Sequence, residues 1–206
     1  EISYLFTKLG KFEKNMKEAI RLIGEYSGVS RVYVFENFNN SEFTKNTYEW
    51  CNKNIEPQID NLQEIPYEII PSYKKFLVGK GMVVSSNILE LPQDLIDILE
   101  PQKIKSIFIL PIYVKDQFFG FMGFDECEKH RIWEKSEIEL LKTVTNSIST
   151  LFERKQAEED IKKRNEELEI FNRMAVGREI KMIELKKEIN SLLEKAGEKP
   201  AYEIVE

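Results

Sequence analysis

The sequence has little histidine and cysteine: one histidine, His130, and two cysteines, Cys51 and Cys127, among 206 residues. A single histidine excludes multi-histidine metal centres, and a Ser–His–Asp triad would have to use His130 itself. Two cysteines are too few for a disulfide framework, and they fit a reducing compartment. We therefore expect a cytoplasmic protein without a disulfide scaffold.

Basic residues are outnumbered, because 30 Lys and Arg stand against 36 Asp and Glu and leave a net charge of −6. A nucleic-acid partner normally requires a basic patch, so we expect none. No apolar run approaches the roughly 20 residues that span a bilayer, and no charged-then-apolar leader stands at the start, so we expect no membrane partner. Since the chain begins at Glu1 rather than at a methionine, we interpret it as a fragment or processed product.

Apolar residues suffice for a folded core, at 42% of the chain with 11% aromatic residues. We expect about the first 150 residues to fold as one domain. An amphipathic helix is predicted at its start, ending at Gly28. Its apolar residues recur at three- and four-residue steps: Phe12, Met16, Ala19, Ile20, Ile23 and Tyr26.

A hairpin follows this helix, with strands predicted at Arg31–Glu36 and Thr44–Asn52 around a turn-rich segment. The middle of the domain is less regular. We expect one short helix to open at Pro66 and to be closed by Gly79–Gly81, an edge strand at Met82–Ser86, and a short helix over Pro92–Leu99.

The clearest strands are Ser106–Val114 and Phe118–Phe124, which a hairpin-length turn joins. Both are apolar at successive residues, which indicates a sheet that is covered on both faces. Gly120 and Gly123 inside a strand predict the close approach of another backbone, for which a helix is the expected source. Pro111 is expected at a sheet edge or a bulge.

The last third of the chain predicts one long helix that begins near Glu134. Its first turns pack on the domain through Leu141, Val144, Ile148 and Leu151. A heptad repeat then predicts a coiled coil, with Gly177 as the expected hinge or break. The alternative is a solvated helix without a signalling role. The repeat runs through Ile161, Leu168, Ala175, Met182, Ile189 and Ala196, with Phe171, Leu185 and Leu192 in the companion position.

Four segments together resemble a GAF domain and the helix by which such modules leave the domain in sensor histidine kinases, and a fifth resembles a connector found beside PAS and GAF modules in such proteins. They are Lys105–Val114, Gly120–Asp125, Trp133–Leu141, Leu151–Glu159 and Asn172–Asn190. The resemblance implies an α+β fold in which helices flank a central antiparallel sheet, followed by a long C-terminal coiled-coil helix. It also implies a small-molecule pocket on one face of the sheet, roofed by the irregular middle segment.

The resulting domain boundaries are 1–152 for a GAF sensory domain, 153–198 for a coiled-coil signalling helix and 199–206 for a flexible tail. The expected ligand-binding residues are Tyr33, Phe35, Trp50, Tyr73, Phe76, Ile107, Ile109 and Asp125. For any one of the aromatic residues, ordinary core packing is the alternative. The expected homodimer interface comprises Phe12, Met16, Ile148, Ile161, Leu168, Phe171, Met182, Leu185, Ile189 and Leu192.

Our functional hypothesis is a non-enzymatic sensory domain of a cytoplasmic signalling protein, namely a histidine kinase, whose output domain is absent from this chain. The cofactor and ligand are left unassigned. One alternative is a haem or metal sensor that uses Cys127 or His130, although a closed zinc site needs four ligands. Another is a methionine sulfoxide reductase with Cys127 and Cys51, which the acidic neighbours of Cys127 disfavour. In a third, the pocket is collapsed and the domain only dimerises.

Overall fold

The computed structural model describes residues 12–204. Residues 1–11 and 205–206, which our boundaries assign to the domain and the tail, lie outside the described residues. The chain forms two compact units that divide between Lys155 and Gln156, and each is described by itself. Among residues 12–204, no helix is both long and apolar enough to cross a membrane.

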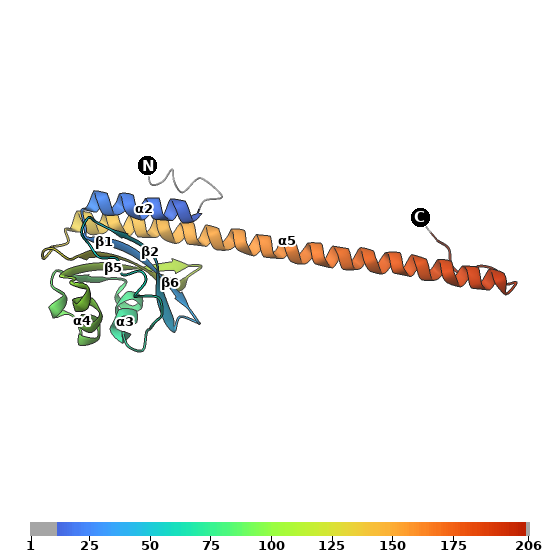
Figure 1. Cartoon of the computed structure of the whole chain (residues 1–206), viewed down its shortest axis with the longest axis horizontal. Helices are drawn as coiled ribbons and strands as arrows, with labels where there is room; N and C mark the ends of the chain where they lie inside the picture. The colour runs from blue at the N-terminus through green and yellow to red at the C-terminus, as the bar shows by residue number, and fades with distance from the viewer. Residues whose placement is uncertain (1–11, 205–206) are drawn as a thin grey trace. The chain divides into compact units, whose positions relative to one another are not determined.

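The first unit is built on a six-stranded sheet in the order β3-β2-β1-β6-β5-β4, with every neighbouring pair antiparallel (Figure 1). This confirms the expected α+β fold with a central antiparallel sheet. The strands are β1 (Arg31–Phe38), β2 (Phe43–Cys51), β3 (Ile65–Pro66), β4 (Val83–Ser85), β5 (Ser106–Val114) and β6 (Gln117–Glu126).

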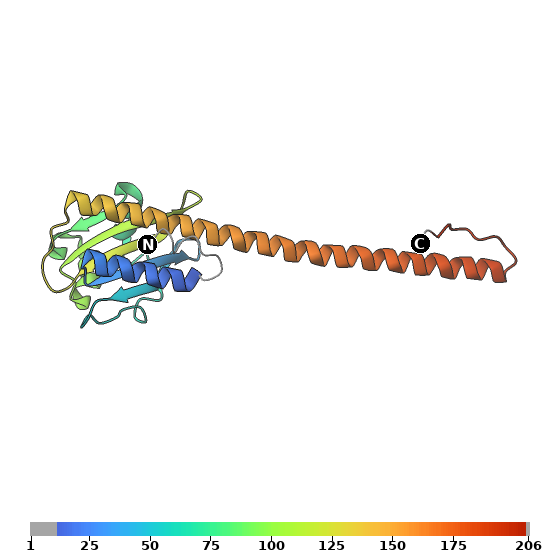
Figure 2. The same cartoon turned by 90° about the horizontal axis from the view of Figure 1, so that it is seen from above.

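Helices cover both faces of the sheet. The helix α2 and the first turns of α5 lie side by side on one face, and α3 and α4 lie on the other (Figures 1 and 2). The helices are α2 (Phe12–Ser27), α3 (Pro71–Lys80), α4 (Gln93–Leu99) and α5 (Lys135–Lys195), with short 3-10 turns at Ile88–Glu90 and Glu100–Gln102.

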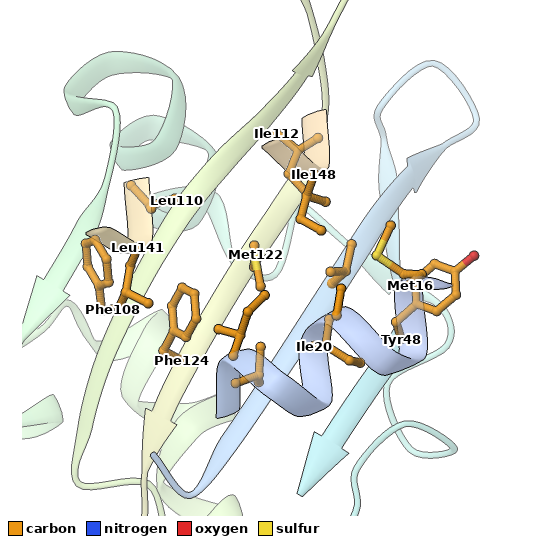
Figure 3. Packing of buried hydrophobic residues seen from close by; sticks show 14 of the residues in the cluster. Met16, Ile20, Tyr48, Phe108, Leu110, Ile112, Met122, Phe124, Leu141 and Ile148 are labelled. Carbon is orange, nitrogen blue, oxygen red and sulfur yellow. The ribbon is translucent and has the colours of Figure 1, made fainter. Parts of the chain in front are cut away.

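The first core lies between the sheet and the pair formed by α2 and α5. Met16 and Ile20 of α2 meet Met122 of β6, and Leu141 and Ile148 of α5 join them (Figure 3). The predicted packing face of α5 is therefore confirmed. The prediction that Tyr26 belongs to the apolar face of α2 was wrong, because Tyr26 is 81% exposed and lies outside the core.

The second core lies under α3 and α4, so the two-faced burial read from the apolar strands is confirmed. Strand β1 serves both cores because its side chains alternate between the two faces. Val32 and Val34 point into the first core, while Tyr33 and Phe35 point into the second.

The helix predicted to open at Pro66 begins later. Pro66 belongs to β3, and Pro71 instead occupies the first turn of α3, where its missing N–H leaves no helical bond unmade. The C-terminal end of α3 is as expected. Gly81 caps it in the left-handed conformation at φ 75°, which glycine adopts without strain.

The two glycines of β6 make room for close neighbours, but no helix supplies them. A Cβ at position 120 would overlap the backbone carbonyl of Phe35, and one at position 123 would overlap the ring of Tyr33. Both neighbours belong to β1, the strand paired with β6. The prediction of close approach therefore holds, while the expected helix was wrong.

Substitution of Gly120 by alanine is expected to destabilise the domain by about 1–3 kcal/mol, because the Phe35 carbonyl can move only if the β1–β6 ladder shifts. Gly79→Ala is the matched control. Position 79 lies in α3 with nothing within 4 Å of a new Cβ, so this substitution is expected to stabilise by about 0.5–1 kcal/mol. Urea unfolding of both variants measures the difference, and equal unfolding midpoints would contradict the expectation.

The second unit consists of the continuation of α5 and the segment after it. The helix passes through Gly177 without interruption, so the break expected there does not occur. After Gly197, which has φ 79°, the chain turns back. The side-chain amide of Asn190 then holds it, accepting hydrogen bonds from the N–H groups of Ala201 and Tyr202 and donating one to the Tyr202 carbonyl, at 2.7–3.0 Å.

Candidate functional site

A cavity of about 30 Å³ opens in the second core, between strands β1 and β6 and the helices α3 and α4. A volume of this size admits about two or three water-sized groups. Its walls are mostly apolar and aromatic, as ligand sites in proteins usually are. The lining residues are Tyr33, Phe35, Thr44, Leu62, Ile65, Ile70, Tyr73, Ile98, Leu99, Gln102, Ile104, Phe121 and Asp125.

Four of the residues expected to bind a ligand meet at this cavity: Tyr33 and Phe35 from β1, Tyr73 from α3, and Asp125 from β6. The strand register explains the arrangement. Tyr33 is paired with Gly123, whose missing side chain leaves the space that the tyrosine ring occupies.

The other four expected residues lie elsewhere. Ile107 and Ile109 are fully buried in the same core without lining the cavity, and Phe76 packs at its border beneath the Lys80 ammonium group, 4.3 Å away. Trp50 lies on the opposite face of the sheet, where a Cβ on Gly24 of α2 would overlap its ring. The geometry therefore gives none of these four direct access to the cavity.

Three aromatic rings form a stack along the wall of the cavity. Phe35 and Phe121 are stacked with their centroids 4.7 Å apart and an interplanar angle of 10°. Tyr73 stacks on the same Phe121 ring at 5.5 Å. Such pairs stabilise a core beyond simple area burial, so this wall is firmly packed.

A group of buried charges lies at one end of the cavity. The guanidinium Nε of Arg31 is 3.2 Å from Oδ2 of Asp125, and its Nη1 is 3.7 Å from Oε1 of Glu49. All three side chains are at most 3% exposed. The hydroxyl of Tyr33 donates a 2.9 Å hydrogen bond to Oδ1 of Asp125, and Gln102 accepts one from Arg31.

Burial raises the pKa of Asp125 to about 6, although the nearby Arg31 charge and the Tyr33 hydroxyl act in the opposite direction. Desolvation also raises the pKa of Tyr33 and Tyr73 above the usual value for a phenol, and the Asp125 charge adds to the effect. These tyrosines are therefore neutral at physiological pH, and Asp125 titrates close to it.

The pH dependence of stability is expected to report Asp125. The folded pKa of about 6 lies above the ordinary 3.8, so between these values the folded state binds a proton that the unfolded chain lacks. This contribution is fully present below about pH 4 and is lost as the pH rises through about 6, a change of roughly 2–3 kcal/mol. Urea unfolding across this range should show it in wild type and not in Asp125→Asn. Parallel curves would contradict it.

The two cysteines are half-buried free thiols. Burial, followed by the charge of Glu49, raises the pKa of Cys51 to about 12, and burial likewise raises the pKa of Cys127. A reactive cysteine needs a lowered pKa, so this environment argues against thiol catalysis. His130 contacts the Ser86 carbonyl at 3.0 Å. Among residues 12–204, no three His, Cys, Asp or Glu side chains lie together as a metal site requires.

Sequence reasoning missed the charged end of the site. Arg31 and Glu49 were assigned to strands without a role, and Gln102 was not considered. A signal was present for Arg31, because it alternates with Tyr33 and Phe35 along β1 and must share their face. No comparable sequence pattern indicated that Ile98 and Leu99 of α4 would line the cavity.

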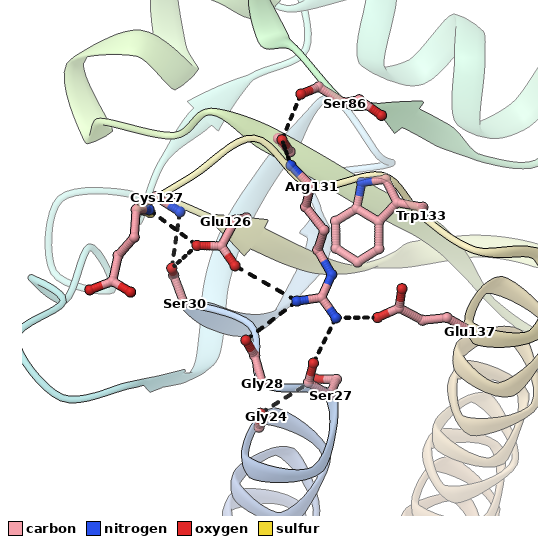
Figure 4. Close-up of polar contacts among 12 residues, drawn as sticks. Gly24, Ser27, Gly28, Ser30, Ser86, Glu126, Cys127, Arg131, Trp133 and Glu137 are labelled. Atoms are coloured by element: carbon pink, nitrogen blue, oxygen red, sulfur yellow. Dashed lines mark hydrogen bonds and ion pairs between the residues drawn. The ribbon is translucent and has the colours of Figure 1, made fainter.

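A second polar centre lies on the helix side of the sheet, around Arg131 (Figure 4). Its guanidinium donates to the carbonyls of Ser27 and Gly28 at the end of α2, at 2.7 and 3.4 Å. It also forms ion pairs with Glu137 in the first turn of α5, at 2.6 Å, and with Glu126 at the end of β6, at 3.7 Å. One side chain thus joins both helices to the strand that carries Asp125.

Comparison with known proteins agrees with this architecture. The family model described as "GAF domain" matches residues 12–151. The methanogenesis regulatory histidine kinase FilI of Methanothrix harundinacea is 34% identical over 156 residues, which are 74% of this chain. The chain spans 18% of the length of that kinase.

Solved structures show the same fold at low identity. The phycocyanobilin-bound GAF domain of a cyanobacterial phytochrome is 17% identical with a TM-score of 0.64, over 76% of this chain and 92% of that one. The PixJ GAF domain of Thermosynechococcus elongatus, in its blue-light absorbing form, is 18% identical with a TM-score of 0.60, over 75% and 94%. With the family model matched across both cores and the cavity, this chain belongs to the GAF domain family.

Proposed function

We propose that this chain is the non-enzymatic sensory part of a cytoplasmic signalling protein, a histidine kinase in the simplest case, and that it reports a small ligand through α5. The observation that carries the proposal is the position of one strand, β6, between a cavity and a polar centre. Its residue Asp125 lines the cavity, while the next residue, Glu126, pairs with Arg131 beside the two helices.

The ligand is smaller than those named for the structural relatives. Some of these domains are described as holding phycocyanobilin or biliverdin, which are linear tetrapyrroles. A cavity of about 30 Å³ admits only a few non-hydrogen atoms. A bilin would require α3 and α4 to separate from the sheet, so we infer a compact ligand.

Transmission would follow from the shared strand. A ligand that binds differently to two positions of β6 shifts their populations, and only that difference in affinity drives the change. Arg131 would convey the movement of Glu126 to Glu137 in the first turn of α5 and to the end of α2. The packing of Leu141 and Ile148 on the sheet would then change with it.

The output would be a dimer formed by the second unit. The large apolar residues of the predicted α5 seam are 39–67% exposed in the single chain, and an exposed heptad seam is typical of a helix that pairs with a copy of itself. Met16 and Ile148, which we expected in the interface, are fully buried in the chain's own core and have no surface to offer. Phe12 packs on Phe152. The interface we propose is therefore the seam from Ile161 to Leu192.

Native mass spectrometry of the full chain tests the proposal. We expect a dimer that carries a bound small molecule, and we expect Ile98→Trp, which fills the cavity from α4, to form the dimer without it. Leu89→Trp is the matched control, because Leu89 is 61% exposed and does not line the cavity. A monomer at high micromolar concentration, or a dimer in which no molecule depends on the cavity, would contradict the proposal.

A further inference from the structure

One oxygen of the cavity carboxylate has no hydrogen-bond partner. Asp125 is 1% exposed, and its Oδ1 accepts a bond from Tyr33, but no hydrogen bond from the described residues reaches Oδ2. Arg31 Nε is 3.2 Å away without hydrogen-bond alignment, and it also makes no hydrogen bond. A buried polar atom left in this way costs free energy, and a ligand that donates to it removes the cost.

Tyr73 supplies a second polar group at the cavity. The side chain of Tyr73 is 5% exposed and lines the cavity, and its hydroxyl forms no hydrogen bond to any residue between 12 and 204. A neutral phenol both donates and accepts. The cavity therefore offers an ionised acceptor, Asp125, and a hydroxyl, Tyr73, to one small ligand.

The charge balance selects the sign of that ligand. Two carboxylates, Asp125 and Glu49, face one guanidinium, Arg31, so the buried group carries one excess negative charge. None of the lining residues is a lysine or arginine. A carboxylate or phosphate ligand would add a second unpaired buried charge, which is strongly unfavourable, whereas a cation of one charge would neutralise the group.

The remaining walls of the cavity are mostly apolar, and they favour a ligand with an apolar body. Phe35, Ile98 and Ile104 line the cavity with no polar side-chain atoms. The stacked rings of Phe121 and Tyr73 attract a nearby cation through their π-electrons. The volume of about 30 Å³ limits the ligand to a few non-hydrogen atoms.

From these observations we propose that the cavity binds a small alkylammonium ion, a protonated primary amine whose ammonium group donates to Oδ2 of Asp125. Its alkyl group packs on Phe35 and Ile104, and its ammonium group also contacts the Tyr73 hydroxyl. This inference rests on the proposed sensory function and names the chemistry that the same cavity recognises.

Isothermal titration calorimetry of the full chain at neutral pH, with three probes of similar size, tests the inference. Ethylammonium chloride is expected to bind, whereas ethanol and sodium acetate are expected to give no binding heat. Loss of a charge-assisted hydrogen bond weakens binding about 10- to 100-fold, so Asp125→Asn is expected to lose ethylammonium by at least that factor. Asp116→Asn, in the exposed turn between β5 and β6, is the matched control and should bind as wild type does.

Tyr73→Phe keeps the ring and removes the hydroxyl, and is expected to weaken ethylammonium binding about 3- to 10-fold. Binding of acetate or ethanol in preference to ethylammonium would overturn the ligand class and leave the sensory function standing. Ethylammonium binding that Asp125→Asn does not change would overturn the site. If no probe binds, while native mass spectrometry still detects a molecule that Ile98→Trp excludes, the amine is wrong and the sensory function stands. If both experiments are negative, both proposals fall.

Discussion

Replacement of Arg31 by methionine is expected to destabilise the first unit by about 3–5 kcal/mol at neutral pH. Methionine preserves most of the side-chain length but leaves Asp125 and Glu49 as buried carboxylates without their shared cation. Breaking a buried ion pair from one side costs this much because the remaining charge stays desolvated. Urea unfolding of wild type and variant measures the difference.

The pH dependence identifies the cause. Arg31 lowers the pKa of Asp125, so its removal raises that pKa further above about 6. Once the carboxyl group is protonated in both proteins, the penalty shrinks, so the destabilisation is expected to be smaller near pH 5 than near pH 8. A second substitution, Asp125→Asn, should recover part of the loss in the Arg31→Met background.

Arg21→Met is the control for a guanidinium that is not buried. Arg21 forms ion pairs with Glu18 and Glu25 on α2 at 2.7 and 2.6 Å, which are closer than those of Arg31, but its side chain is 38% exposed. Exposed pairs of this kind contribute little, so no comparable loss is expected. Equal losses in the two variants would show that Arg31 has no special role.

The fold could be predicted from the sequence because its signals are local. Apolar runs at Ser106–Val114 and Phe118–Phe124 require two covered faces, and the three- and four-residue steps after Phe12 require a helix. The start of the helix α3 was predicted wrongly because the local sequence rules allow it at two positions. Proline is suited to the first turn of a helix at either Pro66 or Pro71, and only the short pairing of β3 with β2 decides between them.

The charged part of the site depended on register, which a single sequence does not give. Arg31 meets Asp125 because β1 pairs antiparallel with β6 at that position, and it meets Glu49 through the pairing of β1 with β2. The aromatic residues of the cavity were easier to predict, since Tyr33 and Phe35 lie two positions apart on a strand whose apolar sequence indicates burial. Trp50 was misplaced for the same reason: one step in register decides which face of β2 it occupies.

Gly177 shows that the helix propensity of a single residue does not by itself predict a helix break. Its cost of about 1 kcal/mol in a helix predicts a break only when neighbouring residues do not hold the helix. In α5, turns of good helix-forming residues on both sides continue through it. Propensity at one residue was therefore outweighed by the length of the element.

Ile189→Asp is expected to convert the proposed dimer to a monomer. Ile189 occupies the seam position of the heptad repeat, where a carboxylate would face its own copy in an apolar layer. Sedimentation velocity at micromolar concentration measures the change. The wild-type chain should sediment as a dimer, since the seam from Ile161 to Leu192 otherwise stays in contact with water.

Ile180→Asp provides the matched control, because it makes the same chemical change on the opposite side of the helix. Ile180 is 53% exposed, more than the 39% of Ile189, so exposure in the single chain alone would predict no greater effect at position 189. In a heptad with Met182 and Ile189 in the seam, position 180 points away from the partner helix. The dimer should therefore survive Ile180→Asp. If both variants dissociate equally, or neither does, the two-stranded seam is wrong, and the exposed apolar residues of α5 must pair through another face.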